Sequence, residues 1–258
     1  MFIYKKCEYK MKKNLLITGS SGGIGKAVAV LASKTNHNVC LHFNKDKKGI
    51  NECEKECNKN GADTFVVQGD LSNPDEIKKV FKKYDENFGH LDGLVNNAGI
   101  VDVSSRLDNM SHLRISRMIN VNLIGAMLVA KEAVIRMSTI YDKKGGSIVN
   151  VSSAAAKLGS AGQYIDYAVS KAGLDIFTKG LAEEVATENI RVNGVRPGII
   201  ETEIHAKGGI PDRAKLMAPK VPMKRSGTPD EVAKVIMFLL SENCSYVTGS
   251  TLDVSGGR

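Results

Sequence analysis

The chain has 258 residues, of which 42% are hydrophobic and 25% are charged, and its formal net charge is +8 at pH 7. This balance is typical of a soluble globular protein, and by inspection no apolar run reaches the 18 residues that a membrane-spanning helix needs. The basic opening segment has no apolar core of signal-peptide length, so we expect a cytoplasmic protein that is neither secreted nor bound to a membrane.

The predicted elements begin after a short extension. Residues 1–13 are expected to be a poorly ordered N-terminal extension. From residue 14 onward, short continuous apolar runs alternate with amphipathic stretches of helical periodicity. The candidate strands are residues 14–19, 38–43, 64–69, 91–97, 147–152, 190–197 and 251–255. Continuous apolar strands between helices predict one α/β domain, residues 14–258, with a doubly wound parallel sheet of about seven strands.

A glycine-rich segment, TGSSGGIGKAVAVLA, follows the first predicted strand and opens a helix near Ile24. Glycine permits tight turns and close approach of a ligand to the backbone. The amides and the positive dipole of a helix start suit an anionic pyrophosphate. The segment therefore predicts dinucleotide binding by residues 19–25, although a glycine-rich turn can also simply connect two elements.

A second motif is YAVSK, which places Tyr167 four residues before Lys171. In a helix these two side chains lie on one face. The ordinary pKa of tyrosine is about 10, and a neighbouring ammonium is expected to lower it, which suits an acid/base group. The alternative interpretation of this motif alone is a solvated helix face.

The spacing T-G-x-x-x-G-I-G resembles the short-chain dehydrogenase/reductase family. Other landmarks of that family follow in order: Asp70 in GDLS, NNAG at 96–99, Asn122 in NVNLIGA, VSS at 151–153, YAVSK, and RPG at 196–198 with Thr202 after it. The resemblance spans about residues 14–258 and is closest to glucose-dehydrogenase-like and 3-oxoacyl-reductase-like members. It implies a Rossmann-like fold and hydride transfer between a nicotinamide cofactor and a secondary alcohol or ketone.

The resemblance also implies a catalytic set, which consists of Asn122, Ser153, Tyr167 and Lys171. Tyr167 would be the acid/base, Lys171 would also bind the nicotinamide ribose, and Asn122 would support a water relay. Ser153 matches the serine that holds the substrate oxygen better than Ser152 does. The interval from Ser153 to Tyr167 is about one residue longer than in the family pattern, so either serine could point inward, and Tyr164 is a rival acid/base.

The cofactor would lie along the ends of the strands. The resemblance places Asp70 at the adenine. It places Asn96, Ala98 and Gly99 on the adenosine side, and Pro197, Gly198 and Thr202 at the carboxamide. The expected cofactor-binding residues are Gly19, Ser21, Gly23, Ile24, Gly25, Asn44, Lys45, Asp70, Leu71, Asn97, Ala98, Gly99, Tyr167, Lys171, Pro197, Gly198, Ile200 and Thr202.

The second predicted strand ends in CLHFNKDKK. His42, Phe43 and Asn44 stand where NAD-preferring enzymes of this fold place an acid, and Lys45 follows them. An amide and an ammonium favour a 2′-phosphate, so we expect a preference for NADP(H), with NAD(H) possible. Asp46 nearby and Gly22 in the glycine-rich turn weaken this expectation. The alternative is that these lysines only begin the next helix.

The remaining expectations concern partners. The scattered lysines argue against nucleic acid, and the five cysteines and five histidines form no cluster with metal-ligand spacing. Residues 199–225 are expected to form a lid over a small carbonyl or alcohol substrate. Two helices with broad apolar faces, which include Leu123, Met127, Val134, Leu174, Phe177 and Leu181, indicate a homotetramer unless those faces simply cover the sheet. A non-catalytic NAD(P)-sensing protein of the same fold is the alternative function.

Overall fold

The computed structural model describes residues 12–258 as strands alternating with helices. The strands are β1 (Lys13–Ile17), β2 (His37–Phe43), β3 (Thr64–Gln68), β4 (Gly93–Asn96), β5 (Gly146–Val151), β6 (Ile190–Pro197) and β7 (Thr251–Val254). The helices are α1 (Gly23–Ser33), α2 (Lys47–Lys59), α3 (Pro74–Asn87), α4 (His112–Ile119), α5 (Ala126–Met137), α6 (Ala155–Leu158), α7 (Ile165–Val185), α8 (Ile204–Lys207), α9 (Arg213–Met217) and α10 (Pro229–Leu240).

The seven strands form one sheet in the order β3-β2-β1-β4-β5-β6-β7, and all neighbouring strands are parallel. The predicted fold class, a Rossmann-like doubly wound sheet, is confirmed. The chain order reverses between β1 and β4, and ligands of such sheets bind at the carboxyl ends of the strands beside this reversal.

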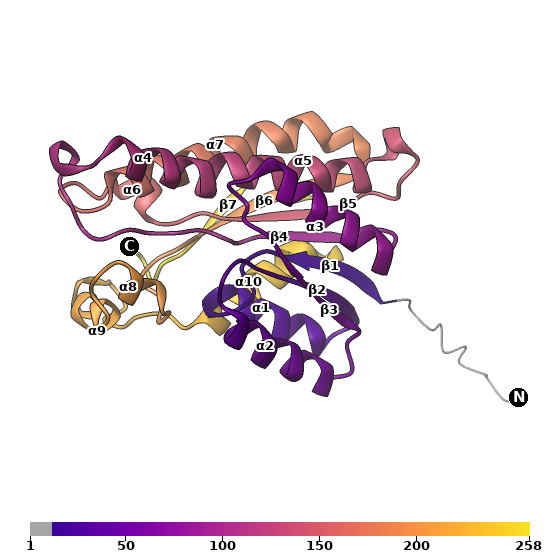
Figure 1. Cartoon of the computed structure of the whole chain (residues 1–258), viewed down its shortest axis with the longest axis horizontal. Helices are drawn as coiled ribbons and strands as arrows, with labels where there is room; N and C mark the ends of the chain where they lie inside the picture. The colour runs from indigo at the N-terminus through magenta and orange to yellow at the C-terminus, as the bar shows by residue number, and fades with distance from the viewer. Residues whose placement is uncertain (1–11) are drawn as a thin grey trace, which may run out of the picture.

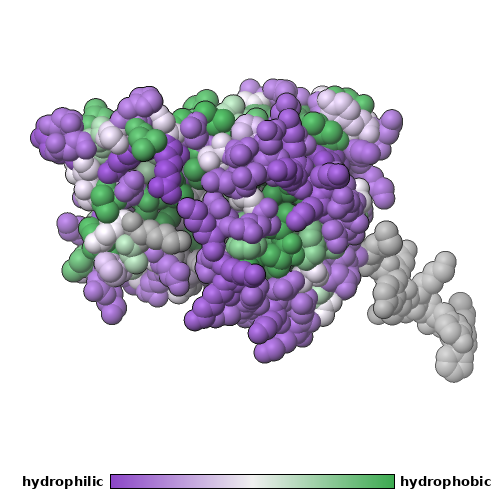
Figure 2. Space-filling view, in the orientation of Figure 1, coloured by the Kyte–Doolittle hydropathy of each residue, from purple (hydrophilic) through white to green (hydrophobic). Residues whose placement is uncertain are grey.

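Helices cover both faces of the sheet. Figure 1 shows α1, α2 and α10 on one side and α3, α4, α5 and α7 on the other. Each face has its own buried core: one includes Ile17, Val28 and Ile236, and the other includes Leu94 and Phe81. The surface over α2 and α3 is mainly hydrophilic in Figure 2, as expected of amphipathic helices that bury one face against a sheet.

The starts of the helices differ in how their first amides are satisfied. Asp46 accepts a hydrogen bond from the Gly49 amide at the start of α2, and Thr228 forms a reciprocal capping box with Glu231 at α10. The residue before α1 is Gly22, and no side chain caps this helix. The first amides of α1 are therefore available to a ligand at the edge of the sheet.

The structure differs from the sequence-based expectations at two places. The expected N-terminal extension lies outside the described residues except for its last two, and Lys13 is already paired with His37 in the sheet. By length and composition the helical run 112–137 could cross a membrane, contrary to our inspection of the sequence. Within it, Val129, Ala133 and Met137 are fully buried in the core under the sheet.

Candidate active site

A cleft of about 1070 Å³ opens along the carboxyl ends of the strands. Nearly all the residues predicted from the sequence line it. The two exceptions are Gly25 and Asn122, which lie behind its wall. Among residues 12–258, no group of three His, Cys, Asp or Glu side chains comes close enough to hold a metal ion.

The glycine-rich turn forms one end of the cleft. Gly19 and Gly23 have φ angles of +68° and +53°, which glycine adopts at no steric cost. A Cβ atom at Gly25 would lie 2.2 Å from the Gly19 carbonyl oxygen, so this position admits only glycine. Gly25 therefore closes the turn by packing and does not line the cleft. The uncapped start of α1 completes a cradle of amides suited to a pyrophosphate.

His42 supports this turn from below, a contact that the sequence analysis did not predict. Its Nδ1 accepts a hydrogen bond from the Gly19 amide at 3.2 Å, and its Nε2 lies 3.0 Å from the Gly69 carbonyl oxygen. An acceptor at Nδ1 requires the neutral ring with its proton on Nε2. Burial lowers the pKa of His42 to about 4, so the neutral ring joins three strand ends over the physiological range.

The end of β2 presents Asn44 and Lys45 to the cleft, as predicted. Although burial acts to raise the pKa of Asp70, hydrogen bonds from Ser72 and Asn44 and the charge of Lys45 lower it. Asp46 also borders the cleft, but its Oδ1 accepts the Gly49 amide at 2.9 Å. The carboxylate that weakened our NADP expectation is therefore engaged in capping α2.

The residues at the end of β4 and just after it differ in whether they face the cleft. The amides of Asn97 and Ala98 both donate to Thr18 Oγ1 at 2.9 Å, which joins this segment to β1. Asn96, by contrast, is buried and donates to the Ala126 carbonyl oxygen and Asn150 Oδ1. Of the NNAG residues, Asn97, Ala98 and Gly99 line the cleft, whereas Asn96 stabilises the strand.

Asn122 lies in a π-helical interruption, Asn120–Gly125, between α4 and α5. Its Oδ1 accepts the Ile100 amide at 2.7 Å, and its Nδ2 donates to the Ile100 carbonyl oxygen at 2.9 Å and to Ser170 Oγ at 3.3 Å. The side chain is fully buried, so it is not a surface amide. It holds the loop after β4 against α7 behind the cleft.

Tyr167 and Lys171 project from one face of α7 into the cleft, with the Lys171 Nζ 5.8 Å from the ring centroid of Tyr167. Lys171 donates to the Val151 carbonyl oxygen at 2.7 Å. Burial lowers the pKa of Lys171 to about 8, against the attraction of Asp175. Burial raises the pKa of Tyr167, and a hydrogen bond with Ser153 opposes this effect. The expected lowering of the tyrosine pKa is therefore absent here, because desolvation outweighs the hydrogen bond with Ser153.

The two serines after β5 face different partners. Ser153 is hydrogen-bonded to the Tyr167 side chain, and its Oγ also accepts the Ala155 amide at 3.1 Å. Ser152 is buried and donates to the Lys171 carbonyl oxygen at 3.1 Å. Tyr164, the rival acid/base, donates to the Gly208 carbonyl oxygen at 3.2 Å. The geometry thus brings Ser153, and not Ser152, to Tyr167.

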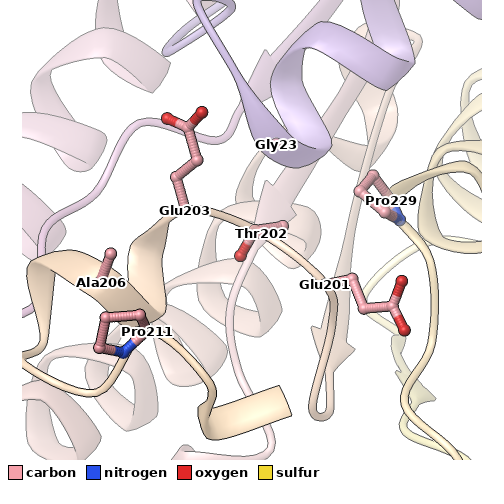
Figure 3. Close-up of a pocket in the computed structure, with 7 residues that line it drawn as sticks. All are labelled: Gly23, Glu201, Thr202, Glu203, Ala206, Pro211 and Pro229. Atoms are coloured by element: carbon pink, nitrogen blue, oxygen red, sulfur yellow. The ribbon is translucent and has the colours of Figure 1, made fainter. Parts of the chain in front are cut away.

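The segment after β6 closes the cleft from the opposite side. Thr202 lies next to the glycine-rich turn, since a Cβ atom at Gly23 would be 3.2 Å from its Cγ2. Gly23 and Thr202 also line a smaller hollow of about 430 Å³. In Figure 3 its two glutamates, Glu201 and Glu203, point in different directions. The residues Pro197 and Gly198, expected at the carboxamide, and Ile200 of the expected lid line the main cleft beside it.

Comparisons with known proteins agree with this geometry. A family model described as enoyl-(acyl carrier protein) reductase matches residues 19–258. The oxidoreductase YgfF of Escherichia coli is 42% identical over 243 residues, 94% of this chain and 98% of its own. Glucose 1-dehydrogenase 2 of Bacillus subtilis is 36% identical over 95% of this chain and 94% of its own. The 3-oxoacyl-[acyl-carrier-protein] reductase FabG of Thermotoga maritima is 40% identical over 95% of this chain and 97% of its own.

Solved structures show the same fold across nearly the whole chain. A short-chain type dehydrogenase/reductase from Mycobacterium marinum superposes with a TM-score of 0.89 at 31% identity, covering 96% of this chain and 95% of that one. A 3-ketoacyl-(acyl-carrier-protein) reductase from Brucella melitensis was solved with NADH. It superposes with a TM-score of 0.88 at 28% identity, and the match covers 96% of this chain and 98% of that one.

Proposed function

Because this chain belongs to the short-chain dehydrogenase/reductase family and transfers hydride between a nicotinamide cofactor and an alcohol or ketone, we propose that Tyr167 is its acid/base. The observation that carries this assignment is the meeting of Ser153, Tyr167 and Lys171 in one cleft with the glycine-rich turn. The proposed catalytic set is the predicted one, with Asn122 acting from behind the wall.

The cofactor supplies the hydride when it is bound, so the protein has to supply or remove one proton. In the reducing direction, the Tyr167 hydroxyl donates its proton to the carbonyl oxygen as that oxygen gains negative charge. Ser153 is placed to donate a hydrogen bond to the same oxygen. Lys171, whose pKa is about 8, is mainly cationic at pH 7 and stabilises the phenolate left behind.

The experiment is to follow NADPH absorbance with a panel of 3-oxoacyl thioesters, sugars and simple diketones. Turnover of a ketone with transfer of the cofactor hydride to carbon supports the proposal. An enoyl thioester belongs in the panel, because the matching family model is described as an enoyl reductase. Tight NADPH binding without turnover of any member would instead support the sensor, which none of the comparisons favours.

We also propose a preference for NADP(H) over NAD(H). Asn44 and Lys45 border the cleft at the end of β2, and the nearby Asp46 carboxylate is engaged at the start of α2. Lys45→Asp should lower kcat/KM for NADPH and raise it for NADH. Lys48→Asp is the matched control, since Lys48 is exposed and lies outside the cleft. Equal or better kcat/KM with NADH in the unmutated protein would contradict the preference.

A cytoplasmic homotetramer is the proposed assembly. Leu174 is buried, and Val134, Phe177 and Leu181 pack partly against the core, so these residues mainly cover the sheet. The outward apolar side chains of the same two helical runs include Ile124, Met127, Ile135, Val169 and Ile176. Light scattering at micromolar concentration tests the assembly, and Ile176→Lys should weaken it if this face is an interface.

A further inference from the structure

Arg213 of α9 reaches across the cleft to the residues just before α7. Its Nη2 donates to Gln163 Oε1 at 2.9 Å, and its Cζ lies 5.1 Å from the ring centroid of Tyr164. Both Tyr164 and Arg213 line the cleft. A guanidinium held over an aromatic face and bound at one corner has a defined orientation. The structure therefore fixes a cation at the substrate side of the lid.

The charge of Arg213 has no carboxylate partner within ion-pair distance in the part of the chain that the structure describes. Its hydrogen-bonded partner, Gln163, is neutral and takes one of the five N–H groups that a guanidinium offers. Arg114 and Arg196, by contrast, each bind a buried or half-buried aspartate. Arg213 thus keeps both its charge and most of its donors for a ligand.

The acidic side chains of the cleft are engaged or placed away from Arg213. Asp102 accepts the Val103 amide at 2.8 Å and lies near Arg114. Glu203 Oε2 is 4.0 Å from the Cβ position of Gly22, at the glycine-rich turn. Two other arginines, Arg117 and Arg258, line the cleft as well. The balance of charge on the substrate side therefore favours an anion.

Arg213 and the proposed acid/base share one cleft. Tyr164 is the residue just before α7, and Tyr167 lies in the first turn of that helix. Both tyrosines and Arg213 line the cleft. An anionic group held by Arg213 and a carbonyl group at Tyr167 can therefore belong to one substrate.

We propose that Arg213 binds an anionic group, a carboxylate or a phosphate, on a ketone or alcohol substrate whose reacting oxygen meets Ser153 and Tyr167. The inference rests on the proposed function and names its substrate class. A guanidinium binds both kinds of group through paired N–H donors, and the net charge of +8 attracts such substrates to the protein.

The test compares ketones that differ only in charge. Levulinate is paired with methyl levulinate, and dihydroxyacetone phosphate with dihydroxyacetone, so that the two pairs distinguish a carboxylate from a phosphate. In the wild type, kcat/KM should be at least about tenfold higher for the anion of one pair, since a charge-assisted hydrogen bond contributes about that much. Arg213→Gln should raise KM for that anion by a similar factor and leave the neutral partner within about twofold.

Two further variants separate charge from structure. Arg213→Lys keeps the charge but loses the paired N–H donors of the guanidinium. Its KM for the anion should therefore lie between those of the wild type and Arg213→Gln. Lys215→Gln, an exposed cation on the same helix, should change neither KM. Equal kcat/KM for charged and neutral ketones in the wild type would overturn the inference. An equal loss for both in Arg213→Gln would show that Arg213 only supports the lid.

Calorimetry keeps this inference separate from the reaction itself. Levulinate and dihydroxyacetone phosphate are titrated into the NADP⁺-loaded protein, and Arg213→Gln should abolish the binding of whichever one the wild type binds. If no ketone is reduced but an anion binds through Arg213, the proposed function fails and the anion site stands. If neither anion binds the wild type, the anion site fails.

Discussion

Arg114 binds both carboxylate oxygens of Asp166, with its Nε 2.9 Å from Oδ2 and its Nη2 3.3 Å from Oδ1. Asp166 Oδ1 also accepts the Tyr167 amide, and Arg114 Nη1 donates to the Val103 carbonyl oxygen at 2.7 Å. The Asp166 side chain is 1% exposed, so this ion pair is desolvated. It joins the loop after β4 to the first turn of α7, directly beside the proposed acid/base.

The first prediction concerns this pair. Arg114→Met should lower the free energy of unfolding by about 3 kcal/mol, because it leaves the Asp166 carboxylate buried without a cation. Adding Asp166→Asn to it should restore part of the loss. Urea unfolding measures both effects. Arg106→Met is the control, since its ion pair with Asp108 is exposed and should contribute less than about 1 kcal/mol. Similar losses for Arg114 and Arg106 would refute the buried-pair explanation.

Tyr167→Phe should lower kcat by about 10² to 10⁴, because it removes the proton donor and little packing. The Kd for NADPH should change by less than about twofold, as measured by fluorescence titration. Tyr164→Phe serves as the control, since it deletes a hydroxyl bonded to the Gly208 carbonyl oxygen and leaves the ring under Arg213. If Tyr164→Phe were the more damaging change, the acid/base assignment would move to Tyr164.

Ser153→Ala should reduce kcat more than Ser152→Ala does. Ser153 is hydrogen-bonded to Tyr167, whereas Ser152 faces the backbone of α7. Steady-state kinetics with one ketone at saturating NADPH gives the ranking. The opposite ranking would mean that the loop between β5 and α7 rearranges when substrate binds.

His42 predicts a dependence of stability on pH. Its folded pKa of about 4 lies below the ordinary value of 6.5, so its contribution is complete above pH 6.5 and is lost as the pH falls toward 4. The loss amounts to about 3 kcal/mol. His42→Gln has no such titration, so the difference in unfolding free energy between wild type and variant should shrink by about 2 to 3 kcal/mol between pH 7.5 and 4.5. The exposed His112→Gln variant is the control, and a constant difference for His42→Gln would disprove the linkage.

The sequence predicts the strands well because each buried strand is a short apolar run between glycine-rich or amphipathic segments. The predicted range 190–197 coincides with β6, and the range 91–97 is longer than β4 at both ends. The carboxyl ends of parallel strands must meet at one edge, so the position of the cleft follows from the order of the motifs. The confirmed family and hydride-transfer activity rest on that order.

Other features depend on contacts that a linear pattern does not contain. Arg114 and Asp166 are 52 residues apart, and only the packing of α4 against α7 brings them together. The direction of the Tyr167 pKa shift depends on burial, which outweighs the hydrogen bond with Ser153. Asn96 and Asn97 are both asparagine, but successive side chains along a strand point to opposite sides, so Asn96 is buried while Asn97 lines the cleft.

We predict a kinetic consequence of the contact between Thr202 and the glycine-rich turn. In the proposed site a dinucleotide held at Gly23 is next to Thr202, so we expect the segment that carries Thr202 to move when the dinucleotide enters or leaves. We therefore expect a compulsory order, with the cofactor first to bind and last to dissociate. Product-inhibition patterns should show the oxidised cofactor competitive with the reduced cofactor, and the alcohol product non-competitive with it.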